Sequence, residues 1–179
     1  MPKHIGIVAC SAEGAALCYR TLCAEAPVRM GQHTHPEVSI HTYPLSDYMV
    51  HIRSGNWQQV SELMLSSVQK LAAIGAKLAV CPDNTIHQAF DLVTEKSPIP
   101  WLHIAETVAQ EAKNRGFQNL ALTGTKYLMT SFVYPTSLKN SISYAKFQRK
   151  INGKRSIPSS LRNSSMEFFL RAQDFTLTK

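Results

Sequence analysis

The sequence has no long apolar run. None of its 179 residues lie in a stretch that approaches the roughly 20 apolar residues needed to cross a bilayer. The first five residues, Met-Pro-Lys-His-Ile, contain no hydrophobic signal segment. We therefore expect a cytoplasmic protein with no membrane partner. The length suits one full domain and is short for two.

Cysteine is scarce and follows no pattern. Cys10, Cys18, Cys23 and Cys81 have neither the paired spacing of a disulfide framework nor that of a zinc site. The simplest interpretation is that they are reduced, buried thiols, and only Cys81 is set apart, by its neighbours. The histidines at positions 33, 35 and 41 are also not at a recognised ligand spacing. We expect no metal.

Excess positive charge is missing from most of the chain. Residues 1–138 contain ten basic and ten acidic residues, whereas residues 139–179 contain nine basic and two acidic ones, which accounts for the net charge of +7. Binding to nucleic acid would have to rest on residues 139–179. That segment lacks aromatic residues interleaved as stacking platforms, so nucleic acid is not the expected partner.

What the sequence does contain is an alternation of strand and helix patterns. Strands are expected at residues 4–9, 37–43, 78–80, 101–104 and 119–123, and helices at 12–26, 54–73, 85–94 and 105–115. Such alternation predicts an α/β fold in which helices flank a parallel β-sheet. Residues 139–179 contain no convincing strand.

Residues 75–87 form the most informative stretch. A short apolar run at 78–80 is followed by Cys81, Asp83, Asn84, Thr85 and His87 at the start of a helical pattern. We call residues 81–87 the 81–87 loop. Parallel sheets bind ligands beyond the carboxyl ends of their strands, and helix N-termini favour anions. The stretch therefore suggests a carboxylate-bearing ligand beside a thiol.

This loop resembles the Cys-x-Asn-Thr-x-His motif of the aspartate/glutamate racemase family. Further matches follow in the same order on both sides, over roughly residues 4–138. They comprise residues 5–8, Ser11, Glu13, Leu17, Tyr19, Arg20, Gly31, His33, Gly55, Trp57, Gly75, Ala76, residues 99–105, residues 122–126 and Tyr134.

The resemblance implies an amino-acid racemase, an isomerase of amino-acid metabolism that needs no cofactor. Such enzymes move the α-proton of aspartate, glutamate or a related dicarboxylate between two cysteines supplied by two pseudo-symmetric halves. Cys81 looks like the first catalytic cysteine. By the same resemblance, the substrate carboxylate would be bound by Ser11, Asn84, Thr85 and His87, with Gly124 and Thr125 contributing from the facing half. Ser11 also suits a plain helix N-cap on spacing alone.

The sequence departs from the family at two points. Two residues, Pro82 and Asp83, separate Cys81 from Asn84, where the family has none or one. Asp83 is therefore a second catalytic candidate, or a negative charge that opposes thiolate formation. The second cysteine has no counterpart in residues 139–179. Two alternatives stay open: a one-base isomerase or decarboxylase, and a silent relative that only binds a small carboxylate.

These observations predict a Rossmann-like racemase fold with an incomplete second half. We expect a first α/β domain at residues 1–100, the start of a second half at 101–138 and a divergent, Ser-rich basic tail at 139–179. The tail is either a natural extension or the product of a truncated or shifted reading frame. We favour the second interpretation, because composition, charge and resemblance all change at one point. A homodimer is compatible with this architecture.

Overall fold

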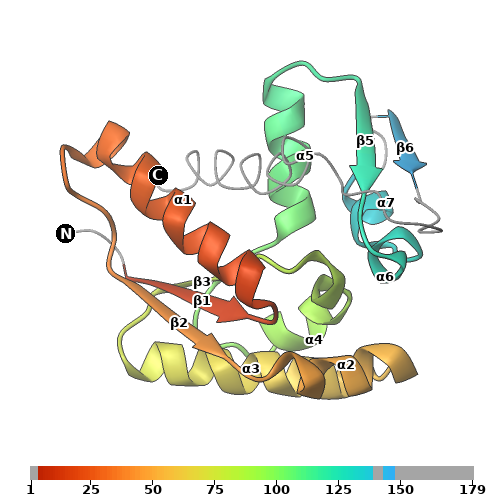
Figure 1. The fold of residues 1–179 in the computed structure, drawn as a ribbon, viewed down its shortest axis with the longest axis horizontal. Helices are drawn as coiled ribbons and strands as arrows, with labels where there is room; N and C mark the ends of the chain where they lie inside the picture. The colour runs from red at the N-terminus through yellow and green to blue at the C-terminus, as the bar shows by residue number, and fades with distance from the viewer. Residues whose placement is uncertain (1–3, 139–142, 148–179) are drawn as a thin grey trace, which may run out of the picture. The chain divides into compact units, whose positions relative to one another are not determined.

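The computed structural model describes residues 4–138 and 143–147 (Figure 1). The chain divides into two compact units, Met1–His103 and Ile104–Lys179.

The first unit is built on a four-stranded parallel sheet with the strand order β2-β1-β3-β4. All five residues of β1 are buried, as expected for a central strand covered on both faces. The parallel α/β architecture predicted from the sequence is thereby confirmed. The strands are β1 (Ile5–Ala9), β2 (Val38–Thr42), β3 (Leu78–Val80) and β4 (Trp101–Leu102).

Helices pack on both sides of this sheet. Figure 1 shows α1 on one side and α2 and α3 on the other. Close packing on the α3 side depends on Gly6, since a β-carbon there would lie 3.1 Å from Leu71 and 3.2 Å from Ala76. The helices are α1 (Ala12–Met30), α2 (Leu45–Ser54), α3 (Trp57–Ala73), a 3₁₀ helix η1 (Asn84–Ala89) and α4 (Phe90–Thr94).

Several helices differ from the sequence-based expectation. The helix expected at 54–73 begins at Trp57, because Asn56 caps it by accepting a hydrogen bond from the Gln59 backbone N–H at 3.2 Å. A separate helix, α2, precedes it and ends at Gly55, whose φ of 69° is left-handed. The helix expected at 85–94 opens as the 3₁₀ turn η1.

The described part of the second unit contains three helices and two strands. They are α5 (Ile104–Asn114), β5 (Asn119–Thr123), α6 (Lys126–Met129), α7 (Val133–Leu138) and β6 (Ser143–Phe147). The strand β6 pairs in parallel with β5 over five residues. The expectation of no strand after residue 139 was therefore wrong. The segment has aromatic residues with strand propensity, but it is too short to show a convincing period.

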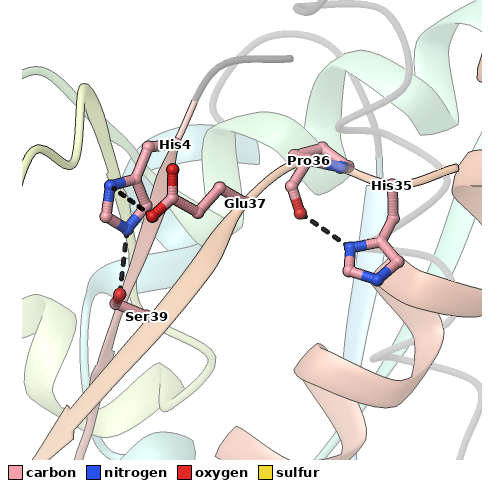
Figure 2. A network of polar contacts seen from close by, with 5 residues as sticks. All are labelled: His4, His35, Pro36, Glu37 and Ser39. Atoms are coloured by element: carbon pink, nitrogen blue, oxygen red, sulfur yellow. Dashed lines mark hydrogen bonds and ion pairs between the residues drawn. The ribbon is translucent and has the colours of Figure 1, made fainter.

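A polar network fixes the amino ends of β1 and β2 (Figure 2). His4, which is 7% exposed, shares a hydrogen bond of 2.9 Å between its Nε2 and the Ser39 Oγ. Its Nδ1 lies 3.7 Å from Glu37 Oε1, and the Ile5 N–H donates to the Glu37 carbonyl at 2.8 Å. These contacts align the first two strands at the edge opposite to their carboxyl ends.

The core of the first unit contains an unusual hydroxyl. Tyr48 of α2 is fully buried, yet its hydroxyl has no partner in hydrogen-bond geometry among the described residues. Burial is the main reason that the pKa of Tyr48 is raised; ionisation of Cys81 or Cys10 would raise it further, and the nearby Ser67 hydroxyl opposes the rise. Ser67 does not reach hydrogen-bond geometry with the Tyr48 oxygen and is engaged by His41 at 3.0 Å, so the protonated phenol pays a desolvation cost that no well-formed hydrogen bond offsets.

We expect Tyr48→Phe to raise the free energy of unfolding by about 1 kcal/mol, because it removes this buried hydroxyl and keeps the ring. Urea unfolding of the variant and the parent measures the difference. Tyr19→Phe, at a position 40% exposed, is the control and should change stability little. A loss of stability in Tyr48→Phe would show that the hydroxyl makes a bond the account omits.

Candidate functional site

The carboxyl ends of β1 and β3 lie side by side, because the two strands are parallel neighbours in the sheet. Cys10 and Ser11 follow β1, and the 81–87 loop follows β3. The Asp83 carboxylate bridges the two connections. Its Oδ2 accepts hydrogen bonds from the backbone N–H groups of Cys10 at 3.0 Å and Ser11 at 3.1 Å, and its Oδ1 accepts one from Ser11 Oγ at 2.5 Å. We call this set of three bonds the Asp83 latch.

Ser11 holds the latch and begins α1 at the same time. As N-cap, its Oγ accepts a hydrogen bond from the Gly14 N–H at 3.2 Å while donating its own proton to Asp83. Gly14 has to be small here. A β-carbon at this position would lie 2.7 Å from Ser11 Oγ and 3.3 Å from Asp83 Oδ1. The structure thus confirms Ser11 as the N-cap of α1, and binding of a substrate carboxylate by Ser11 stays a prediction.

Asp83 and Cys81 occupy different environments. Asp83 is partly exposed, and burial raises its pKa while the three hydrogen bonds from Ser11 and Cys10 oppose the rise. Cys81 is 0% exposed. Its Sγ lies 3.9 Å from the Asp83 carbonyl oxygen, and burial, followed by the Asp83 charge, raises its pKa well above the ordinary value. The thiol therefore stays protonated at neutral pH.

The pKa values of two other thiols near this carboxylate are raised in the same way. Burial, then the charge of Asp83, raises the pKa of Cys18 to about 12 and that of Cys10 further still. Both side chains are buried. A cysteine serves as a base only as thiolate, so the arrangement around Asp83 favours the carboxylate over any of these thiols.

His87 secures the 81–87 loop from inside. It is 3% exposed, its Nδ1 lies 3.1 Å from the Asp83 carbonyl oxygen, and its ring stacks on Phe90 at 5.4 Å and meets His103 edge-on at 5.0 Å. Burial, followed by His103, lowers the pKa of His87 to about 3. This neutral histidine positions the backbone that carries Asp83.

The remaining candidates follow the carboxyl ends of two strands, one in each unit. Asn84 and Thr85 open η1 and are partly exposed. Gly124 and Thr125 are exposed and follow β5 in the second unit, where Thr125 caps α6 by accepting from the Leu128 N–H at 3.5 Å. The first unit thus brings together Ser11, Cys81, Asp83 and His87. A contribution from Gly124 and Thr125 stays a prediction.

The backbone donors of this site were not predicted from the sequence. The N–H groups of Cys10 and Ser11 bind Asp83, but only the Ser11 side chain was singled out. The signal was present in outline, because two strands each followed by polar residues were expected in one parallel sheet. Tyr48, whose pKa responds to Cys81, Cys10 and Asp83, carried no such signal.

Neither a metal centre nor a membrane span is found in the part of the chain that the structure describes. Across residues 4–138 and 143–147, no three His, Cys, Asp or Glu side chains are grouped so as to hold a metal ion. Within the same residues, every helix is too short or too polar to cross a bilayer.

The sheet places the first unit in the class of parallel α/β proteins, whose ligands commonly bind at the carboxyl edge of the strands. The chain belongs, within that class, to the Asp/Glu/Hydantoin racemase family, whose model matches residues 5–159. The match confirms the resemblance and continues beyond residue 138.

Solved structures with names from the same family share the fold. A protein from Yersinia pestis that is provisionally named an Asp/Glu racemase has a TM-score of 0.73 and 24% identity, with 80% of this chain and 64% of that protein covered. An aspartate racemase homologue from Pyrococcus horikoshii OT3 has a TM-score of 0.73 and 24% identity, with 83% of this chain and 65% of the homologue covered. The aspartate racemase of Picrophilus torridus has a TM-score of 0.71 and 17% identity, with 96% of this chain and 72% of the racemase covered. The chain therefore spans less than two thirds of the first two proteins.

The buried His87 predicts a loss of stability in acid. The folded imidazole stays neutral down to about pH 3, whereas in the unfolded chain it takes up a proton below about 6.5. The unfolded state therefore binds more protons between these values, and the free energy of unfolding falls by up to about 1.4 kcal/mol for each unit that the pH falls.

Urea unfolding between pH 4.5 and 7.5, at roughly one-unit steps matched to this range, measures that slope. His87→Gln should flatten the slope, and His51→Gln, at a partly exposed position, should leave it unchanged. An equal slope in the parent and in His87→Gln would contradict the assignment of a neutral buried His87.

Proposed function

We propose that this chain is a cofactor-independent, racemase-type protein that transfers the α-proton of aspartate, glutamate or a related dicarboxylate. Asp83 is the proton-accepting group in this proposal. Family membership supports the reaction class. The observation that carries the choice of residue is the partly exposed Asp83 carboxylate at the carboxyl edge of the sheet, with the fully enclosed Cys81 beside it.

Asp83 suits the role of base better than Cys81 for two reasons. First, burial raises the pKa of Asp83, which makes the carboxylate a stronger base than an ordinary aspartate and brings it closer to the pKa that general bases need. Second, Cys81 is a buried thiol whose pKa is raised by burial and by Asp83 itself, so it has almost no thiolate to offer. Cys81 remains a candidate, but a secondary one.

The groups around Asp83 complete the proposed site. Ser11 donates to Asp83 and holds the carboxylate in place. Asn84 and Thr85 follow Asp83 directly and offer polar side chains for the substrate carboxylate, as the family resemblance implies. A single carboxylate removes and returns a proton on one face of the substrate. Exchange of the α-proton should therefore be faster than inversion.

Deuterium wash-in tests the proposal directly. The protein is incubated with L- or D-aspartate, and separately with glutamate, in heavy water, and α-deuterium and enantiomer are followed by NMR and chiral chromatography. Asp83→Asn should lower the exchange rate by about a hundredfold or more, since it removes the general base. Cys81→Ala should leave the rate nearly unchanged.

Asp91→Asn is the matched control, because Asp91 is an exposed aspartate of the same unit. It should exchange like the parent. Full activity in Asp83→Asn together with lost activity in Cys81→Ala would overturn the choice of base and restore the thiol.

A specific observation also favours a second function, that of a silent carboxylate-binding relative. The donors at the start of α1, namely the N–H groups of Cys10 and Ser11 and the Ser11 hydroxyl, are already taken by Asp83. A latch that stays closed would keep Asp83 from acting as a base. Binding of aspartate or succinate by calorimetry, with no exchange in heavy water, would establish this function in place of catalysis.

A further inference from the structure

The face of β2 that packs against α3 is polar. Residues at alternate positions of a strand share one face, and Ser39, His41 and Tyr43 follow that spacing along and just beyond β2. His41 Nδ1 meets Ser67 Oγ of α3 at 3.0 Å, and the Tyr43 hydroxyl meets Ser66 Oγ of α3 at 2.8 Å. β2 is an edge strand of its sheet, so this polar face borders solvent.

Lys70 of α3 organises the carboxyl end of this face. Its ammonium donates to the Tyr43 oxygen at 2.7 Å and to His41 Nε2 at 3.2 Å. It also lies 4.6 Å from the centre of the Tyr43 ring. Because Nε2 accepts from Lys70, His41 is neutral and carries its proton on Nδ1, which donates to Ser67. The cation is thus held by two neutral acceptors.

The Tyr43 oxygen is consequently prepared for ionisation. Two hydrogen-bonding groups, the Lys70 ammonium and the Ser66 hydroxyl, converge on it. The hydrogen bond from Lys70, followed by that from Ser66, lowers the pKa of Tyr43. The Tyr43 side chain is partly exposed and Lys70 is exposed, so a reagent from solvent can reach the phenol.

We propose that Tyr43, held by Lys70 and Ser66, is an acyl-accepting nucleophile, a site of covalent modification by activated carboxylic acid derivatives. A nucleophile of this kind is activated by an adjacent cation that stabilises its deprotonated form. The site is distinct from the Asp83 latch and does not depend on the function proposed for it.

The reaction is a simple acyl transfer. With N-acetylimidazole as the donor, the Tyr43 oxygen forms a bond to the acetyl carbon and the bond from that carbon to the imidazole nitrogen breaks. Imidazole leaves with the proton that the phenol has given up. No oxidant, reductant or metal is required.

Site-resolved labelling tests the proposal. The full chain is treated with N-acetylimidazole at neutral pH, and acetylation of each tyrosine is followed by peptide mass spectrometry over time. Tyr19 is the internal reference, because it is 40% exposed and a hydrogen bond with Cys23 raises its pKa. Because the pKa of Tyr43 is lowered and that of Tyr19 is raised, Tyr43 carries the larger fraction of phenolate at neutral pH. Tyr43 should therefore react several times faster than Tyr19.

Variants separate activation from exposure. Lys70→Met should slow the labelling of Tyr43 to about the rate of Tyr19, and Ser66→Ala should slow it partly. Lys77→Met removes another exposed lysine of the same unit and should change nothing. Equal rates at Tyr43 and Tyr19 in the parent, an unchanged rate in Lys70→Met, or acetylation of Lys70 in place of Tyr43 would each overturn the proposal.

Discussion

The site depends on one interaction, the hydrogen bonding of the Asp83 carboxylate to Ser11 and Cys10. It joins residues 72 positions apart in the chain and ties the loop after β3 to the start of α1. An anion at this place is favoured by the backbone N–H groups before the helix and by the dipole of the 19-residue α1. Within the same loop, the buried His87 contacts the backbone carbonyl of Asp83 through its Nδ1. Sheet, helix and loop thus converge on a single charged group.

That charge also decides which groups can do chemistry. A carboxylate raises the pKa of buried thiols close to it, and the charge of Asp83 acts in this way, after burial itself, on Cys10, Cys18 and Cys81. Cysteine chemistry would need the charge of Asp83 to be neutralised or moved. This is why the proposed function assigns the proton transfer to the Asp83 carboxylate and not to the thiol that the family resemblance implies. The Tyr43 and Lys70 pair shows the reverse effect, since a cation there favours an ionised oxygen.

The sequence allowed much of the fold to be predicted, because local patterns decide it. Alternating strands and helices indicated the parallel sheet, and the family motifs placed the loop after β3. The helix α2 was missed because its boundary with α3 depends on Gly55 and Asn56, whose turn is clear only in three dimensions. The Asp83 latch could not be predicted in detail, because its donors are backbone groups of a distant turn. The complete burial of Cys81 also could not be predicted, since a thiol that follows a strand can be either exposed or buried.

The most direct test of this account is a titration of the Asp83 carboxyl group by carbon-13 NMR in aspartate-labelled protein, with resonances assigned through variants of Asp47, Asp83, Asp91 and Asp174. We expect Asp83 to titrate above the ordinary aspartate value of about 3.9, because burial outweighs its hydrogen bonds. We also expect Ser11→Ala to move the pKa of Asp83 higher, since Ser11 stabilises the ionised form. An Asp83 that titrates at or below the ordinary value, or that does not respond to Ser11→Ala, would contradict the account.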